Sequence, residues 1–297
     1  MEKMKKKIGW LSVVLITLGL ADTALADQAE LQPVPSAEAP SGATLAANVT
    51  FVSQYVARGF QQSWGKPALQ GSLTYADPSG FFVGTWMSTV SPKLIQDGHV
   101  EVDLYAGYGG SVGDVSYLIQ PYYYLYPGAE LKPTSYTGFT RKTKYDYGEL
   151  LLGATWQWLN INYWYTYTRD YFGYNSDTVF CNSVPDLGCA GTDIHSKGSG
   201  YLEANVNYKF GSGYGLLLHY GHQRIKNFAK LNFSDVKVGL TKTFDKGWSV
   251  GVNYTHLIKV YKPFYKGSPD PFPSLTGDGS ASSPADDQFF VTIAYDF

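Results

Sequence analysis

The segment "YLEANVNYKF" at residues 201–210 carries the pattern that decides the fold. Successive side chains of a β-strand point to opposite faces of the sheet. Read with that period, the segment has one apolar face and one polar face, namely Leu202, Ala204, Val206, Tyr208 and Phe210 opposite Tyr201, Glu203, Asn205, Asn207 and Lys209. The segment is therefore predicted to be a strand that separates an apolar environment from a polar one.

The same kind of segment recurs along the chain, and the predicted strands number twelve. With the strand at 200–210, they lie near 47–59, 67–77, 80–90, 98–109, 114–127, 145–158, 160–172, 213–223, 232–244, 247–260 and 287–297. Aromatic residues make up 16% of the chain and charged residues also 16%, against about 25% charged residues in an average protein. Such a composition favours strands and turns over helices.

The connections between these strands alternate between short and long. Five are tight turns with the sequences "DPSG", "GSVG", "WLN", "GSG" and "DKG", and the six between them are longer, near 60–66, 91–97, 128–144, 173–199, 224–231 and 261–286. A soluble β-sandwich would share the alternating faces. The short and long connections, however, are typical of outer-membrane proteins. We therefore predict an all-β fold, a transmembrane antiparallel up-and-down β-barrel with short periplasmic turns and long extracellular loops.

The amino-terminal region predicts export. Residues 1–26 combine the basic stretch "KMKKK", the apolar run "IGWLSVVLITLGL" and "ALA", which are the three parts of a signal peptide. Residues 27–46 are rich in Ala, Pro and Ser, so we expect a flexible periplasmic tail before a barrel at 47–297. The predicted location is the outer membrane of a Gram-negative bacterium.

The last ten residues, "QFFVTIAYDF", have an apolar row made of Phe289, Val291, Ile293, Tyr295 and Phe297. An open sheet edge in lipid would leave backbone groups unpaired, so the last strand must pair with the first. Tyr295 and Phe297 also resemble the carboxyl-terminal signal that the barrel-assembly machinery recognises. This machinery is therefore an expected partner.

One stretch resembles a known family. The sequence "NVTFVSQYVARGFQQSWGKPALQGSLTYADPSGFFVGTWMSTV" is similar to the opening of the TorF family of porins, with Tyr55, Arg58 and Gly59, then residues 67–71, then residues 79–81. Further similar segments, among them "EVDLYAGY", "YGELLLGATW" and "DVKVGLTKTF", extend the resemblance over nearly all of the chain after residue 47. The resemblance implies an outer-membrane barrel of channel function. It implies no substrate and no catalytic residue, and the loops at 173–199 and 261–286 depart from it.

The polar faces predict which side chains line the lumen: Arg58, Gln70, Glu101, Asp103, Glu149, Glu203, Asn205, Asn207, Lys209 and Lys237. Twelve strands give a backbone barrel roughly 24 Å across, which leaves on the order of 10–12 Å between inward side chains. Charges of both signs in that space allow two interpretations. They either create a transverse field that filters a polar solute or form an internal salt-bridge network that partly closes the lumen.

The sequence also bears on nucleic-acid binding, disulfide formation, metal binding and hydrolysis. Without residues 1–26 the chain has 19 basic and 23 acidic residues, which argues against nucleic-acid binding. Cys181 and Cys189 are expected to form a disulfide in an oxidising compartment, and with His195 as the one nearby ligand we expect neither a metal nor a cofactor. A hydrolase would need a nucleophile beside one of five histidines, His99, His195, His219, His222 and His256, but the segment "LHYGHQ", which contains two of them, has no adjacent serine.

Taken together, the sequence predicts a porin-like channel for passive or weakly selective diffusion of small polar solutes, and not an enzyme. The alternative is a non-conducting structural or surface-interaction barrel that acts through its extracellular loops. Expected partners are outer-membrane lipid and lipopolysaccharide, whose phosphates could meet the basic loop at 128–144, which contains Lys132, Arg141, Lys142 and Lys144.

Overall fold

The computed structural model describes residues 42–132, 141–179, 193–261, 265 and 284–297. The predicted signal peptide at 1–26, most of the predicted tail and the cysteine pair Cys181 and Cys189 lie outside the described residues. Among the residues that are described, no helix is long and apolar enough to cross a membrane.

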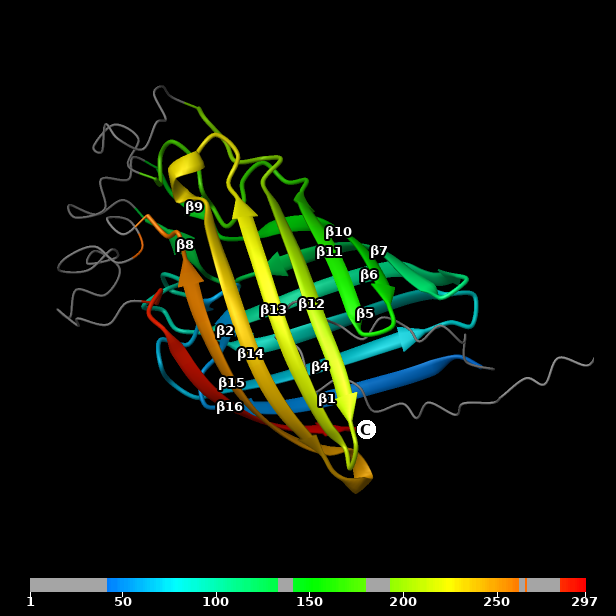
Figure 1. The fold of residues 1–297 in the computed structure, drawn as a ribbon. Helices are drawn as coiled ribbons and strands as arrows, with labels where there is room; N and C mark the ends of the chain where they lie inside the picture. The colour runs from blue at the N-terminus through cyan, green and yellow to red at the C-terminus, as the bar shows by residue number, and fades with distance from the viewer. Residues whose placement is uncertain (1–41, 133–140, 180–192, 262–264, 266–283) are drawn as a thin grey trace, which may run out of the picture.

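The described chain forms one closed antiparallel β-barrel of twelve strands, as predicted (Figure 1). In chain order the barrel strands are β1 (Thr44–Val52), β4 (Ala68–Ala76), β5 (Phe81–Thr89), β6 (Val100–Val112), β7 (Val115–Leu125), β10 (Tyr147–Trp156), β11 (Leu159–Thr166), β12 (Gly200–Phe210), β13 (Tyr214–Arg224), β14 (Phe233–Thr243), β15 (Trp248–Ile258) and β16 (Gln288–Asp296). Each strand pairs with its neighbour in the chain, which is the up-and-down topology.

Four shorter strands form two small hairpins outside the barrel sheet. They are β2 (Val56–Ala57) with β3 (Phe60–Gln61), and β8 (Glu130–Leu131) with β9 (Thr143–Lys144). Two 3₁₀ turns, η2 (Ala229–Leu231) and η3 (Asp245–Gly247), complete the described elements. Both hairpins belong to the long connections, so these loops are folded in the parts that the structure describes.

The barrel closes between β1 and β16, as the alternating carboxyl-terminal segment predicts. The antiparallel register runs from Asn48 opposite Asp296 to Val52 opposite Thr292. Closure gives every barrel strand two neighbours, so no strand keeps an unpaired edge.

Two observed strands end at least six residues before their predicted ends, whereas the other strand ends agree within about three residues. β1 begins at Thr44, so the last three residues of the predicted tail belong to the barrel, and it ends at Val52 instead of running to residue 59. Positive φ angles at Arg58 (45°) and Gly59 (81°) turn the chain back on itself and create the β2–β3 hairpin. β11 ends at Thr166 instead of 172, because Thr168 leaves the strand and its hydroxyl accepts a 3.0 Å bond from the Gly148 amide.

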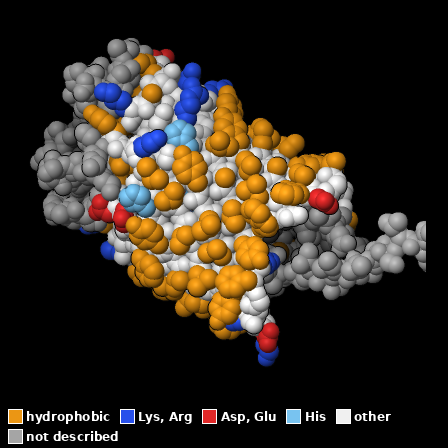
Figure 2. Space-filling view, viewed as in Figure 1, with side chains coloured by type: hydrophobic (Ala, Val, Ile, Leu, Met, Phe, Trp, Pro, Cys, Tyr) orange, Lys and Arg blue, Asp and Glu red, His pale blue; other side chains and the backbone are white. Residues whose placement is uncertain are grey.

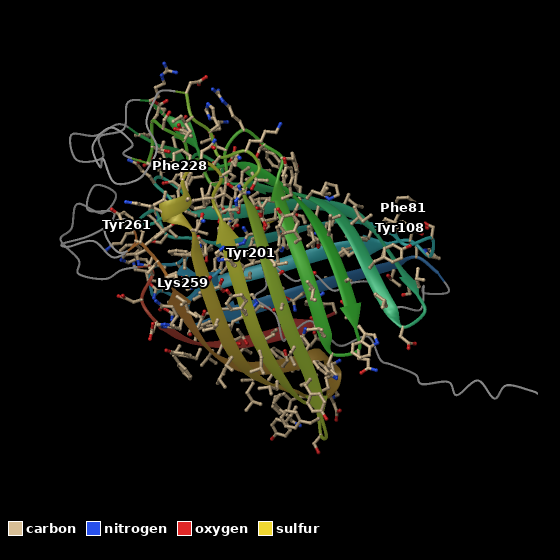
Figure 3. The ribbon with its side chains drawn as sticks, turned by 45° about the horizontal axis from the view of Figure 1, so that its top comes forward. Phe81, Tyr108, Tyr201, Phe228, Lys259 and Tyr261 are labelled. Atoms are coloured by element: carbon tan, nitrogen blue, oxygen red, sulfur yellow. The ribbon has the colours of Figure 1, made fainter. Side chains whose placement is uncertain are left out.

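The outer surface of the barrel is apolar. In the described part of the chain 37 large hydrophobic side chains are exposed, from Leu45 in β1 to Phe297 at the end. Figure 2 shows hydrophobic side chains, in orange, spread over the visible face of the barrel. Soluble monomers rarely expose contiguous apolar patches beyond about 300–600 Å². Aromatic pairs gather at the short turns, for example Phe81 with Tyr108 at 4.9 Å between ring centroids (Figure 3). An apolar outer surface with aromatic residues near the strand ends is typical of a barrel that lies in lipid.

Phe297 extends the seam beyond β16. Its backbone N–H donates to the Ala47 carbonyl at 3.0 Å, and its ring lies 4.7 Å from the ring of Tyr295. We expect Phe297→Ala to reduce the amount of heat-modifiable, assembled barrel in the outer membrane. The substitution removes the ring that contacts Tyr295, and it removes the terminal aromatic residue of the predicted assembly signal. The equally exposed Val112 at a short turn provides a control, Val112→Ala. Equal assembly of the two variants would contradict the role of Phe297.

Candidate functional site

The inward faces of the strands place a set of charged side chains inside the barrel. Five carboxylates are buried there, each at most 2% exposed: Glu101, Asp103, Glu149, Glu203 and Asp235. The buried cations are Arg58 and Lys237, with His219 beside them. Burying a charge is costly unless it is paired and hydrogen-bonded. The partners of these groups therefore define the candidate site.

Arg58 enters the interior from the β2–β3 hairpin, not from the first barrel strand as the sequence pattern suggested. The hairpin lies against the barrel: the Tyr55 ring contacts the Trp86 ring at 5.5 Å, and the Ser91 amide donates to the Gln62 carbonyl at 2.9 Å. At the turn, Gly59 leaves no room for a Cβ, which would lie 2.7 Å from a methyl group of Leu257. The hairpin turn approaches Leu257 on β15 so closely that glycine is required at this position.

The Arg58 guanidinium joins two strands of the barrel wall, β10 and β13. Its Nη2 lies 2.6 Å from Oε2 of Glu149 on β10, and its Nη1 donates to Oε1 of Gln223 on β13 at 2.9 Å. Its planar group lies 4.4 Å from the centroid of the Tyr201 ring, which adds a cation–π contact. Glu149 also accepts a bond from the Thr166 hydroxyl at 3.2 Å. Arg58 is therefore a cross-brace through the interior.

A second network joins β12, β13 and β14 next to this brace. The Tyr201 hydroxyl donates to Oδ1 of Asp235 at 2.9 Å, and His219 Nε2 lies 2.9 Å from Oδ2 of the same carboxylate. His219 Nδ1 lies 2.7 Å from Oδ1 of Asn205. On the neighbouring strand, Glu203 accepts from Asn162 at 2.8 Å and from the Trp164 indole at 3.0 Å. The carboxylates of this wall are all supplied with donors.

The remaining two carboxylates lie on β6, two residues apart on the same inward face. Glu101 Oε1 accepts a 2.9 Å bond from the Tyr126 hydroxyl, and Asp103 Oδ2 accepts a 2.9 Å bond from the Tyr122 hydroxyl. Burial, and then the nearby Glu101 carboxylate, raise the pKa of Tyr126 well above its ordinary value. The Tyr126 phenol consequently stays protonated at physiological pH and remains a hydrogen-bond donor.

The structure brings together eight of the ten side chains that the sequence predicted for the lumen. Arg58, Gln70, Glu101, Asp103, Glu149, Glu203, Asn205 and Lys237 are buried, whereas Asn207 is intermediate and Lys209 exposed near the turn after β12. The list of predicted lumen residues omitted Tyr201, His219, Gln223 and Asp235, all of which are buried on the inward faces of β12–β14; the alternation of strand 201–210 had already placed Tyr201 on its polar face. Whether these residues meet a passing solute stays a prediction.

The charges favour the second of the two interpretations, a salt-bridge network, at the level of Arg58. Arg58 and Glu149 are in direct contact, with side chains 7% and 0% exposed. A transverse field needs opposite charges that face each other across open space, whereas these two meet. The interior in the described conformation is therefore braced and narrow at this level.

The basic loop between β7 and β10 is paired with acids of the chain itself in its described part. Lys132 contacts Asp97, and Lys142 lies 3.4 Å from Glu130. Arg141 lies 3.9 Å from Asp177. These pairs are solvent-exposed, where an ion pair contributes roughly 0–1 kcal/mol. Binding of lipopolysaccharide to this basic loop therefore stays a prediction.

One Ser–His contact bears on the hydrolase hypothesis. His222 Nδ1 lies 2.9 Å from the Ser234 hydroxyl oxygen, across β13 and β14 on the outer face. A catalytic base also needs a third group that orients its ring. In the described residues no such group contacts the second ring nitrogen of His222. Inside the barrel, His219 contacts Asp235, Asn205 and Tyr201, with Glu203 3.7 Å from its Nδ1.

Comparison with known proteins gives one assignment at the level of family. Residues 36–268 match the model of a family described as a bacterial protein of unknown function, Gcw_chp. The chain belongs to the Gcw_chp family. No curated protein sequence matches this member of the Gcw_chp family. The match does not name the TorF family, so that resemblance remains an expectation.

Solved structures similar to this Gcw_chp protein are outer-membrane proteins with low identity to it. The KdgM porin is 10% identical with a TM-score of 0.46, covering 85% of this chain and 99% of that chain. OpdK from Pseudomonas aeruginosa is 11% identical with a TM-score of 0.37, over 87% and 67% of the two chains. Salmonella typhi OmpF, in a complex with daunomycin, is 13% identical with a TM-score of 0.38, over 86% and 97%. At TM-scores below 0.5 these similarities carry no functional conclusion, and the fold rests on the strand pairing itself.

Proposed function

We propose that this protein is a porin-like channel of the outer membrane of a Gram-negative bacterium, through which small polar solutes diffuse passively. The observation that carries the proposal is a closed twelve-stranded barrel with an apolar exterior and a charged interior. Among transmembrane proteins, only helices and closed barrels satisfy the backbone in lipid. Barrels of this kind with polar interiors form aqueous channels when the interior is wide enough.

The Arg58 hairpin sets the narrowest level of the proposed channel. Its guanidinium spans from β10 to β13 through two hydrogen-bonded contacts. A barrel of twelve strands leaves on the order of 10–12 Å between its inward side chains, and a side chain that crosses this space occupies much of it. Permeation through this level is therefore restricted to small solutes, or follows movement of the hairpin.

The alternative function is a non-conducting barrel that acts through its extracellular loops. The observation in its favour is the burial of the interior charges, because Asp103 and Glu149 are 0% exposed and Arg58 6%. The two functions differ in one measurable property, which is whether the assembled barrel conducts.

Single-channel recording in planar bilayers tests the proposal. We expect discrete current steps from the purified protein, and roughly twofold larger steps from the double variant Arg58→Ala/Glu149→Gln, because it removes the crossing side chain without leaving a buried charge unpaired. The matched control is Lys246→Ala, which removes a cation from the short turn before β15, far from the brace.

Three outcomes are informative. Steps from the unmodified protein that grow in the double variant and not in Lys246→Ala support both the channel and the position of its narrowest level. Equal steps in all three proteins would place that level elsewhere. Silence across salts and voltages, with the barrel shown to be inserted, would favour the structural alternative.

A further inference from the structure

The two walls of the barrel interior differ in how completely their polar atoms are bonded. On β10–β14, Glu149 accepts from Arg58 and Thr166, and Asp235 accepts from Tyr201 and faces His219. The opposite wall, β4–β7, is drawn in cyan and green behind the yellow and orange strands (Figure 1). Its buried polar atoms without a hydrogen-bond partner include Gln70 Oε1, Trp86 Nε1, Asp103 Oδ1 and Gln120 Oε1.

These four atoms belong to side chains that are at most 3% exposed. Buried polar groups in native proteins are almost always satisfied, and an exception calls for a specific explanation such as an ion or a bound water. Several exceptions on one wall call for a shared explanation. The opposite wall, built from the same kinds of residues, shows that this chain can satisfy its interior where no ligand is needed.

The strand register places the atoms next to one another. Gln70 lies opposite Ser88, and Ser88 lies opposite Glu101, so these three form one inward row across β4, β5 and β6. Trp86 lies opposite Asp103 in the next inward row. Side chains directly opposite each other are about 4.5–5.5 Å apart at Cβ, and successive inward residues are about 7 Å apart along a strand. Gln70 therefore lies two strands from Glu101 and Asp103, and the three side chains belong to one inward-facing patch of β4–β6.

Two carboxyl groups face this patch. Asp103 makes no ion pair with any Lys, Arg or His of the described residues. Glu101 lies two residues away on the same inward face of β6. Carboxylate and amide oxygens are the ligands that hard cations prefer. The described residues contain no group of three His, Cys, Asp or Glu suited to a tightly held metal, which points to a weakly held monovalent cation.

We propose that Glu101, Asp103 and Gln70 form a binding site for a partly hydrated monovalent cation, such as K⁺ or Na⁺, on the inner wall of β4–β6. The Trp86 indole N–H donates to a water of its hydration shell. Asp and Glu side chains that line a pore select cations over anions. If the proposed channel function holds, this site makes the channel cation-selective. The binding itself does not depend on conduction.

The selectivity test is the reversal potential in planar bilayers under a KCl gradient. We expect the unmodified protein to prefer K⁺ over Cl⁻, and Asp103→Asn to lower this permeability ratio by about fivefold, because it removes the central charge of the site. The matched control is Asp114→Asn, which changes an exposed carboxylate in the turn between β6 and β7. A channel whose permeability ratio is the same in Asp103→Asn and the unmodified protein would overturn the inference and leave the channel function standing.

The binding test works without conduction. The unfolding temperature of the detergent-solubilised barrel is measured in KCl and in choline chloride at equal ionic strength, since choline is too large for the site. We expect KCl to raise this temperature for the unmodified protein and for Asp114→Asn, but not for Asp103→Asn. Equal temperatures in both salts for the unmodified protein would rule out the site. If Asp103→Asn does not assemble, Gln70→Met replaces it, and a full K⁺ effect in that variant counts equally against the site.

Discussion

Arg58→Ala is expected to lower the free energy of unfolding by about 3–5 kcal/mol, the usual cost of removing one partner from a buried ion pair. Glu149 would keep its bond from Thr166 but would remain a carboxylate at 0% exposure without its guanidinium. The Tyr201 ring would also lose the cation that lies 4.4 Å from its centroid. Urea unfolding of the refolded barrel in detergent micelles measures the change.

The double variant Arg58→Ala/Glu149→Gln tells the charge effect from simple loss of packing. Glutamine keeps one of the two acceptor oxygens, so it can still accept from either Thr166 or Tyr124, and it leaves no unpaired charge. We expect the double variant to recover at least about half of the loss, because neutral replacements of a buried pair are often tolerated. A double variant as unstable as Arg58→Ala alone would show that Arg58 acts by filling space and not by pairing with Glu149.

Gly221→Ala is expected to destabilise the barrel by about 2–4 kcal/mol, from overpacking and from a broken buried hydrogen bond. A Cβ at this inward position of β13 would lie 1.9 Å from the Tyr201 hydroxyl oxygen and 2.6 Å from Oδ1 of Asp235. Tyr201 would have to move, which breaks its bond to Asp235 and shifts the ring beside Arg58. The same unfolding measurement detects the loss.

The control for this prediction is Gly211→Ala at the turn between β12 and β13. An added Cβ there meets nothing within 4 Å, so we expect a change within about ±0.5 kcal/mol, as for surface substitutions in general. Equal effects at the two glycines would mean that the loss at Gly221 reflects the strand backbone and not the displacement of Tyr201.

Much of the fold could be predicted from the sequence because alternate residues of each strand face lipid and are therefore apolar. A segment such as 201–210 has one alternation and therefore one way to place its apolar face toward lipid. Tight turns such as "GSG" fix where each strand reverses. The observed strand β12, Gly200–Phe210, accordingly coincides with its predicted range.

The partners inside the barrel could not be predicted in the same way. Alternation gives the direction of each side chain but not its height, because height depends on how far each strand is staggered against its neighbour. Glu149 and Glu203 were predicted to point inward and are buried in the structure. Their hydrogen-bond partners Arg58, Asn162 and Trp164 are known only from the three-dimensional arrangement. His219 and Asp235 lie 16 residues apart in sequence and 2.9 Å apart in space.

The sequence alone determined the class of the protein: an alternating, aromatic-rich chain whose faces sort into apolar and polar, and whose twelve segments must close into a barrel. Tertiary structure alone decided what the interior does with its charges. Residue 58 extends the alternation of the first strand, yet positive φ angles at Arg58 and Gly59 send it into a hairpin that braces the opposite wall. The local alternation of a strand indicates whether a side chain faces lipid or the interior. The pairing of Arg58 with Glu149, 91 positions apart in sequence, depends on closure of the whole sheet.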